Sequence, residues 1–167
     1  MTVTPFDHLD TARDFAALHL LREKAMCLVV RQRPNGTPEL LVLDQPEAPE
    51  AGVQLPAGGV EAGETPEAAA GRELGEETGL NLPPSVYLKS YLWEAQLPDC
   101  LTRQVCHAFL FLAPPDLPDE WERQADGERF AFRWVPAATA SLDWEMDAAL
   151  PDLLRHLSAS PMEPSHD

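Results

Sequence analysis

Residues 58–80, which read GGVEAGETPEAAAGRELGEETGL, constrain the fold of this chain more than any other segment. Thr65 is a favourable helix N-cap, and Pro66 suits the first position of a helix. Gly79 stands where helices commonly end in a left-handed residue. The segment therefore predicts a helix over residues 66–78, held between two glycine-containing loops.

Three acidic residues of this predicted helix, Glu73, Glu76 and Glu77, fall within an arc of about 100°. Their placement is locally unfavourable, because Glu73 and Glu77 are like charges one turn apart and all three lie where the helix dipole favours cations. A divalent cation would reverse both effects, since hard ions bind clustered carboxylate oxygens. The alternative interpretation is an acidic helix face that is simply solvated.

The acids belong to a longer pattern, G-x5-E-x7-R-E-U-x-E-E-x-G-U, in which U is a bulky aliphatic residue. The chain satisfies every position of it with Gly58, Glu64, Arg72, Glu73, Leu74, Glu76, Glu77, Gly79 and Leu80. On this motif the chain closely resembles the Nudix hydrolase family. The resemblance implies an α/β fold, the family's α/β/α sandwich, with a mixed β-sheet and a loop-helix-loop catalytic motif.

The resemblance also implies roles for individual residues. Arg72 would orient the helix carboxylates through charge-assisted hydrogen bonds, whereas the simpler alternative is an ion pair with Glu76 one turn away. Gly58 and Gly59 would leave room for the phosphates of a substrate. The implied catalytic residues are Arg72, Glu73, Glu76 and Glu77, and the implied metal ligands are Glu73, Glu76, Glu77 and the backbone carbonyl of Ala57. Glu64 would lie close by, and would either bind metal through water or hold the loop.

The activity that the resemblance implies is a Mg²⁺-dependent pyrophosphohydrolase, with Mn²⁺ as a second suitable ion, acting on a nucleoside diphosphate linked to another moiety. Cations would bridge carboxylates and phosphate oxygens and deliver a water molecule to phosphorus. A general base is also required, which the family takes from a motif glutamate or from a later loop. Here the segment 119–128 offers Glu120, Glu122 and Glu128, each of which is alternatively an ordinary surface acid.

The choice of substrate rests on weaker pointers. Residues 55–58, LPAG, resemble the motif opening of ADP-ribose pyrophosphatases, which favours a nucleotide sugar such as ADP-ribose. Those relatives tend to carry a proline about sixteen residues past the motif, where this chain has Gln96. Dinucleoside polyphosphates and nucleoside triphosphates therefore stay as alternative substrates. A non-catalytic nucleotide sensor of the same fold stays as an alternative function.

Aromatic residues could stack on the base of a nucleotide substrate. Trp93 and Trp121 lie near the ends of predicted elements and are candidates to line a substrate pocket. Four other side chains are expected to be core residues. Phe130, Phe132 and Trp134 alternate along one face of a predicted strand, and His107 has apolar neighbours.

Outside the motif, apolar patterning predicts a single domain over residues 1–157. Residues 1–23 are either a helical arm for dimerisation or an ordinary packing helix, and residues 158–167 are expected to form a disordered tail. The predicted strands are 24–32, 39–44, 86–96, 104–113 and 128–135, and the further predicted helices are 12–22 and 144–157.

The acidic charge of the chain excludes several partners. Twelve Lys and Arg residues against 28 Asp and Glu residues leave a formal net charge of −16. Such a charge repels polyanions and anionic lipid surfaces, so we expect no nucleic-acid polymer and no membrane as partner, and RNA-cap processing is disfavoured. We expect a cytoplasmic monomer or homodimer that acts on a small-molecule nucleotide derivative.

Overall fold

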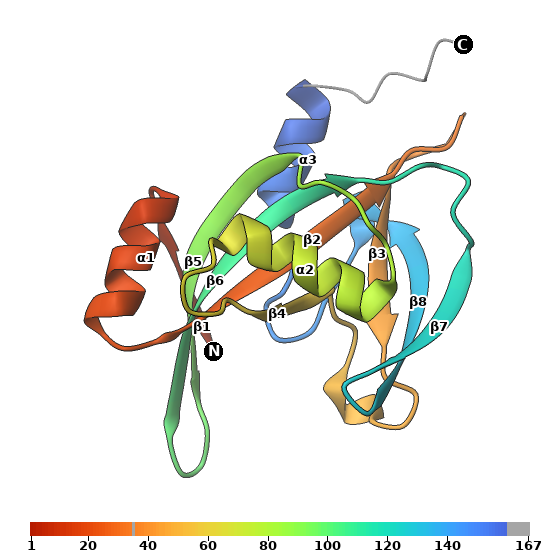
Figure 1. The fold of residues 1–167 in the computed structure, drawn as a ribbon. Helices are drawn as coiled ribbons and strands as arrows, with labels where there is room; N and C mark the ends of the chain where they lie inside the picture. Colours follow the sequence, from red (N-terminus) through yellow and green to blue (C-terminus); the bar gives the residue numbers. More distant parts are fainter. Residues whose placement is uncertain (35, 160–167) are drawn as a thin grey trace.

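A computed structural model describes residues 1–34 and 36–159 of the 167-residue chain. Within them, three α-helices pack around one eight-stranded sheet (Figure 1). The helices are α1 (Leu9–Leu18), α2 (Pro66–Thr78) and α3 (Leu150–Ala159). The strands are β1 (Thr2–Phe6), β2 (Arg22–Arg31), β3 (Glu39–Asp44), β4 (Ala57–Gly59), β5 (Val86–Gln96), β6 (Leu101–Leu112), β7 (Glu120–Ala125) and β8 (Glu128–Pro136).

The sheet is mixed, as the sequence predicts. Its strands follow the order β1-β5-β6-β2-β3-β8-β7, in which β2 and β6 are parallel and the other neighbours are antiparallel. Along β2, strand β3 pairs only with the last two residues, and the short strand β4 pairs with residues 24–26. This arrangement places Ala57, Gly58 and Gly59 beside residues 24–26 at the centre of the molecule.

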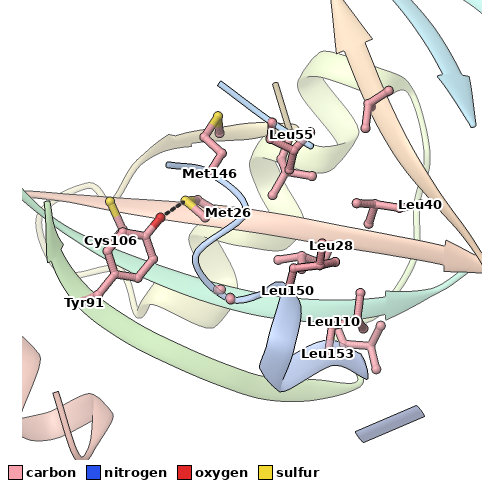
Figure 2. Packing of buried hydrophobic residues seen from close by; sticks show 14 of the residues in the cluster. Met26, Leu28, Leu40, Leu55, Tyr91, Cys106, Leu110, Met146, Leu150 and Leu153 are labelled. Carbon is pink, nitrogen blue, oxygen red and sulfur yellow. Dashed lines mark hydrogen bonds between the residues drawn. The ribbon is translucent and has the colours of Figure 1, made fainter. Parts of the chain in front are cut away.

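The sheet separates two layers of apolar side chains, because successive residues of a strand point to opposite faces. Ala25, Cys27 and Val29 of β2 face α2, and Met26, Leu28 and Val30 face α3. Figure 2 shows the α3 side of this core, where the Tyr91 hydroxyl donates a hydrogen bond to the Met26 sulfur at 3.3 Å. Helices on both faces of a mixed sheet confirm the predicted three-layer arrangement.

Helix α2 spans the predicted residues 66–78. The Thr65 hydroxyl accepts a hydrogen bond from the Ala68 amide at 3.1 Å, and Gly79 ends the helix with a positive φ of 80°. On its inner side Ala69, Ala70 and Leu74 are fully buried against the sheet. The capping residues therefore set both ends of this helix where their positions predict.

The N-terminal segment differs from its prediction. Thr2–Phe6 forms an unpredicted edge strand on β5, and the helix expected over residues 12–22 is Leu9–Leu18 instead. The helix ends early because Leu20 takes a left-handed conformation with φ 54° before the chain enters β2. Ala12 and Ala16 of α1 are buried against β5 and β6 of the same chain.

Three further expectations need correction. The helix expected over residues 144–157 begins only at Leu150, because Trp144 and Glu145 have positive φ angles of 59° and 53°. The segment 119–128, expected to be a loop, forms strand β7 and its turn into β8. Residues 158 and 159 of the expected tail belong to α3, and residues 160–167 lie outside the described residues.

None of the helices in residues 1–34 and 36–159 has the length and apolar character needed to cross a membrane.

Candidate active site

The glycine-containing strand β4 lies against the acidic part of α2. The two elements come together because β4 pairs with β2 and α2 packs across the same strand. A Cβ atom added at Gly58 would overlap the carboxylate of Glu73, so only glycine permits this approach. The backbone of Ala57–Gly59 and the helix acids therefore form one continuous site.

Arg72 lies at the centre of this site and joins the loop to the helix. Its guanidinium donates two hydrogen bonds to the Glu64 carboxylate, at 2.8 and 2.9 Å. It also donates to Glu73 at 2.8 Å, to Glu76 at 3.3 Å and to the Gly59 carbonyl at 2.9 Å. The structure thus contains both the pair with Glu76 and the wider set of contacts that the family resemblance implied for Arg72.

The contacts of Arg72 set the charge states of its partners. Its hydrogen bonds lower the pKa of Glu64 to about 2, and the bonds to Glu64 and Glu73 raise the pKa of Arg72 itself. Both groups are therefore charged at neutral pH, and the two parallel bonds hold them in a defined orientation. Glu64, which precedes α2, is in this way fixed to the second turn of the helix.

Glu77 has a different environment from the carboxylates that bind Arg72. It accepts a hydrogen bond from the Ala57 amide at 3.3 Å, and burial, supported by the charge of Glu73, raises its pKa to about 8. Burial also raises the pKa of Glu73. Two desolvated carboxylates beside each other are costly when both are ionised, and a bound cation would remove that cost.

The acids do not, however, converge on one point. Among residues 1–34 and 36–159, no three acidic, histidine or cysteine side chains form a group that could hold a metal ion. The physical reason is visible in the contacts, because Arg72 draws Glu64, Glu73 and Glu76 toward its guanidinium while Glu77 bonds to Ala57.

The three proposed general bases lie on the β7–β8 hairpin, and all three are exposed. Trp121 and Ala125 of β7 pack on the α2 side of the sheet, so the alternation of the strand turns Glu120 and Glu122 to the opposite face. Glu128 alternates with Phe130 and Phe132, which belong to the core on the α2 side. Its position in the strand therefore gives it the same face as the acidic helix.

The tip of this hairpin brings a further acid to the site. Arg123 donates a hydrogen bond to the Glu76 carbonyl at 3.2 Å, which holds the hairpin beside α2. The charge of Asp126, in the turn between the strands, contributes to raising the pKa values of Glu73 and Glu77. Sequence reasoning missed Asp126, although the Asp126-Gly127 pair is a turn signal that places it at a hairpin tip.

The two tryptophans suggested for a substrate pocket have different surroundings. Trp121 stacks on Phe132 at 5.1 Å, and its indole N–H donates to the Thr78 carbonyl at 3.1 Å, so it joins α2 to the sheet. Trp93 lines a cavity of about 210 Å³ on the α3 side of the sheet. Figure 2 shows four other lining side chains, Tyr91, Cys106, Met26 and Met146.

This cavity borders the candidate site through Lys24. The Lys24 side chain lines the cavity, its residue pairs with Gly59 in the sheet, and its charge lowers the pKa of Glu77. The buried indole N–H of Trp93 has no hydrogen-bond partner within the described residues. The remaining aromatic predictions are confirmed, since Phe130, Phe132 and Trp134 pack in or against the core and His107 is fully buried.

The fold and this arrangement of loop and helix define a class of protein, the NUDIX domain, whose family model matches residues 12–157. The chain belongs to the Nudix family. This confirms the resemblance that the motif at 58–80 carries.

Solved structures of similar fold include proteins with several functions. An Ap4A hydrolase from C. elegans has a TM-score of 0.60 and 18% identity, with 83% of this chain and 99% of that chain covered. The NUDIX domain of Shewanella oneidensis NrtR, solved with ADP-ribose, has a TM-score of 0.61 and 15% identity over 82% and 88% of the two chains. A dihydroneopterin triphosphate pyrophosphohydrolase from E. coli has a TM-score of 0.58 and 23% identity over 80% and 95%.

A curated relative is also similar in sequence. An octanoyltransferase from Myxococcus xanthus is 37% identical over 107 residues, which cover 62% of this chain and 28% of the relative. The match therefore concerns a minor part of that longer protein.

Proposed function

We propose that this chain is a metal-dependent pyrophosphohydrolase that cleaves the diphosphate linkage of a nucleoside diphosphate joined to another moiety. The observation that carries the proposal is the site itself, in which Arg72 ties Glu64 to the carboxylates of α2 and Glu77 lies partly buried beside Ala57. Mg²⁺ or Mn²⁺ bound there would offset the charge of the phosphates and activate a water molecule.

The donor atoms of the site suit such an ion by their chemistry, although the carboxylates would have to turn away from Arg72 to converge on it. Carboxylate and carbonyl oxygens are the ligands that Mg²⁺ prefers, and burial penalises the ionised forms of Glu73 and Glu77 in the absence of a cation. We propose Glu73, Glu76, Glu77 and Glu64 as the carboxylate ligands, and the Ala57 carbonyl as a backbone ligand. Arg72 would orient them, and Gly58 and Gly59 would leave space for the phosphates.

We propose Glu128 as the general base among the three candidates. The support comes from strand alternation, which gives Glu128 the face of α2 and turns Glu120 and Glu122 away from it. A general base has to reach the attacking water, so the face on which it lies decides its competence. Asp126, at the tip of the same hairpin, adds negative charge that would favour proton removal.

The substrate that we propose is a nucleotide sugar such as ADP-ribose. The LPAG sequence at 55–58 supports it, as does the similarity in fold to a NUDIX domain solved with ADP-ribose. The cavity beside Trp93 and Lys24 would take the ring of the nucleoside, because its size of about 210 Å³ and its aromatic lining suit one ring system. The net charge of −16 supports a small substrate over a nucleic-acid polymer.

The test is a screen of nucleotide sugars, dinucleoside polyphosphates and nucleoside triphosphates with Mg²⁺ and with Mn²⁺. We expect metal-dependent turnover of at least one diphosphate compound, reduced more than about 100-fold in Glu77→Gln, because loss of a metal ligand removes a contribution worth several kcal/mol. Glu67→Gln is the matched control, since Glu67 is an exposed residue in the first turn of the same helix. Binding of ADP-ribose without any turnover would instead identify a nucleotide sensor.

A further inference from the structure

A network of hydrogen-bonded polar side chains, buried at Ser90 and His107, leads from the sheet to the metal-binding loop proposed above. The Tyr87 hydroxyl donates to the Ser90 hydroxyl at 2.8 Å, and Ser90 lies 2.6 Å from Nδ1 of His107. Nε2 of His107 lies 2.9 Å from the Glu23 carboxylate. Ser90 and His107 are fully buried, so these groups are closed to substrate and must act through other residues.

The hydrogen bonds of this side-chain network run in one consistent direction, from Tyr87 to Glu23. Ser90 accepts from Tyr87 and can donate its own proton to Nδ1 of His107, which leaves Nε2–H to donate to Glu23. Burial lowers the pKa of His107, which agrees with a neutral imidazole, and hydrogen bonds from Arg13 and His107 outweigh burial and lower the pKa of Glu23. Each donor therefore has an acceptor, and Glu23 is held as an ion in a single orientation.

Arg13 of α1 connects this ion to the catalytic loop. Its guanidinium donates to both oxygens of Glu23, at 3.1 and 3.4 Å, and also to the carbonyl of Glu64 at 3.3 Å. The carbonyl of Glu23 in turn accepts the Val60 amide at 2.9 Å. The loop between β4 and α2 is thus held at two points, directly by the Glu23 carbonyl and indirectly through Arg13. Its Glu64 carries the carboxylate that binds Arg72.

We infer that Arg13 and Glu23 are positioning residues that hold the loop 60–64, and with it the proposed ligand Glu64, beside helix α2. Helix α1, which contributes no residue to the motif, would by this contact tune the affinity of the site. The inference rests on the proposed function for its catalytic consequence, but its structural part, the fastening of the loop, is tested without any substrate.

The test compares Arg13→Gln and Glu23→Gln with a matched control, Arg103→Gln. Arg103 also lies against α1, over the ring of Phe15, and pairs with Glu94 at 3.2 Å, with a side-chain exposure of 30% against 36% for Arg13. It makes no hydrogen bond to the loop among the described contacts. The first readout is hydrogen exchange at the Val60 and Glu64 amides without metal, and the second is Mn²⁺ affinity by calorimetry.

We expect exchange at these two amides to be about fivefold faster and Mn²⁺ binding about fivefold weaker in both loop variants, as for loss of a partly exposed charged hydrogen bond. Arg103→Gln should match the wild type in both readouts, and Arg13→Lys, which keeps one charged donor, should recover part of the loss. Unchanged loop exchange, or an equal acceleration of all amides, would overturn the inference. Absence of turnover in the wild type would contradict only the proposed function.

Discussion

At Gly58 the absence of a Cβ atom allows the close approach of the Glu73 carboxylate. An added Cβ would occupy the position of the Glu73 carboxylate, which Arg72 holds at 2.8 Å. We therefore expect Gly58→Ala to lower turnover at least about tenfold and to cost about 1–3 kcal/mol of stability, in the range of overpacking substitutions. Kinetics and chemical denaturation measure the two effects.

The control for this substitution lies on α2 itself. A Cβ added at Gly71 meets no atom within 4 Å, so Gly71→Ala should stabilise the helix by about 0.5–1 kcal/mol and leave turnover intact. Equal effects of the two substitutions on turnover would show that the close approach of Gly58 to Glu73 has no catalytic importance.

Glu77 couples the stability of the metal-free protein to pH. Burial raises its folded-state pKa from 4.5 to about 8, so the folded chain keeps a proton that the unfolded chain loses. Protonated Glu77 therefore stabilises the folded chain fully below about pH 4.5, and this contribution is lost as the pH rises through 8. The free energy of unfolding changes by at most about 1.4 kcal/mol per pH unit in between. The free energy of unfolding in EDTA should therefore fall over this interval.

Denaturation of wild type and Glu77→Gln across this pH range measures that contribution, because other titrating groups are common to both proteins. The difference between their free energies of unfolding should change steadily between the unfolded-state pKa of 4.5 and the folded-state pKa of about 8. A constant difference would mean that Glu77 has an ordinary pKa in the folded chain.

At the scale of elements, the β7–β8 hairpin places two candidate bases, Glu122 and Glu128, on opposite faces of the sheet. We expect Glu128→Gln to lower kcat at least about tenfold, since Glu128 shares the face of α2 and a positioned base contributes about 10²–10⁴-fold. Glu122→Gln, on the opposite face of the hairpin, should leave kcat within about twofold of the wild type. A Glu128→Gln variant that keeps the wild-type kcat would exclude Glu128 as the base.

Elements with strong local signals could be predicted from the sequence. Helix α2 carries a cap at each end, and β3 and β5 carry apolar runs, so their predicted and observed bounds agree. The missed strands lack such signals. β1 contains Pro5, β7 reads EWERQA with mostly exposed residues, and β4 is three residues long with two glycines. Their partners in the sheet, and not their own composition, make them strands.

Some residues of the candidate site could likewise be predicted from local sequence, and others could not. Glu64, Arg72 and the helix acids follow from one contiguous motif. The structure brings Glu64, Glu73 and Glu76 together around the Arg72 guanidinium, whereas Glu77 bonds to the Ala57 amide. Asp126 and Arg13 are distant from the motif in the sequence. Asp126 reaches the site through the β7–β8 hairpin, and Arg13 reaches it through α1. Spacing along a chain carries no information about such contacts until the topology is known.

At the scale of the whole molecule, the formal charge of −16 has two parts with different responses to ions. The dispersed surface acids repel one another, and any salt screens that repulsion. The acids around Arg72 and Glu77 would respond to Mg²⁺ specifically, because a ligand that binds only the folded chain stabilises it by mass action, by about 2.7 kcal/mol at one hundred times its Kd.

Thermal unfolding in NaCl and MgCl₂ at matched ionic strength separates the two parts. We expect both salts to raise the Tm of the wild type, and MgCl₂ to raise it further by several degrees. In Glu77→Gln the increment specific to Mg²⁺ should largely vanish while the response to NaCl persists, since the variant loses one carboxylate of the site and keeps the surface charge. An equal response of the wild type to both salts would mean that its acids act only as a diffuse charge.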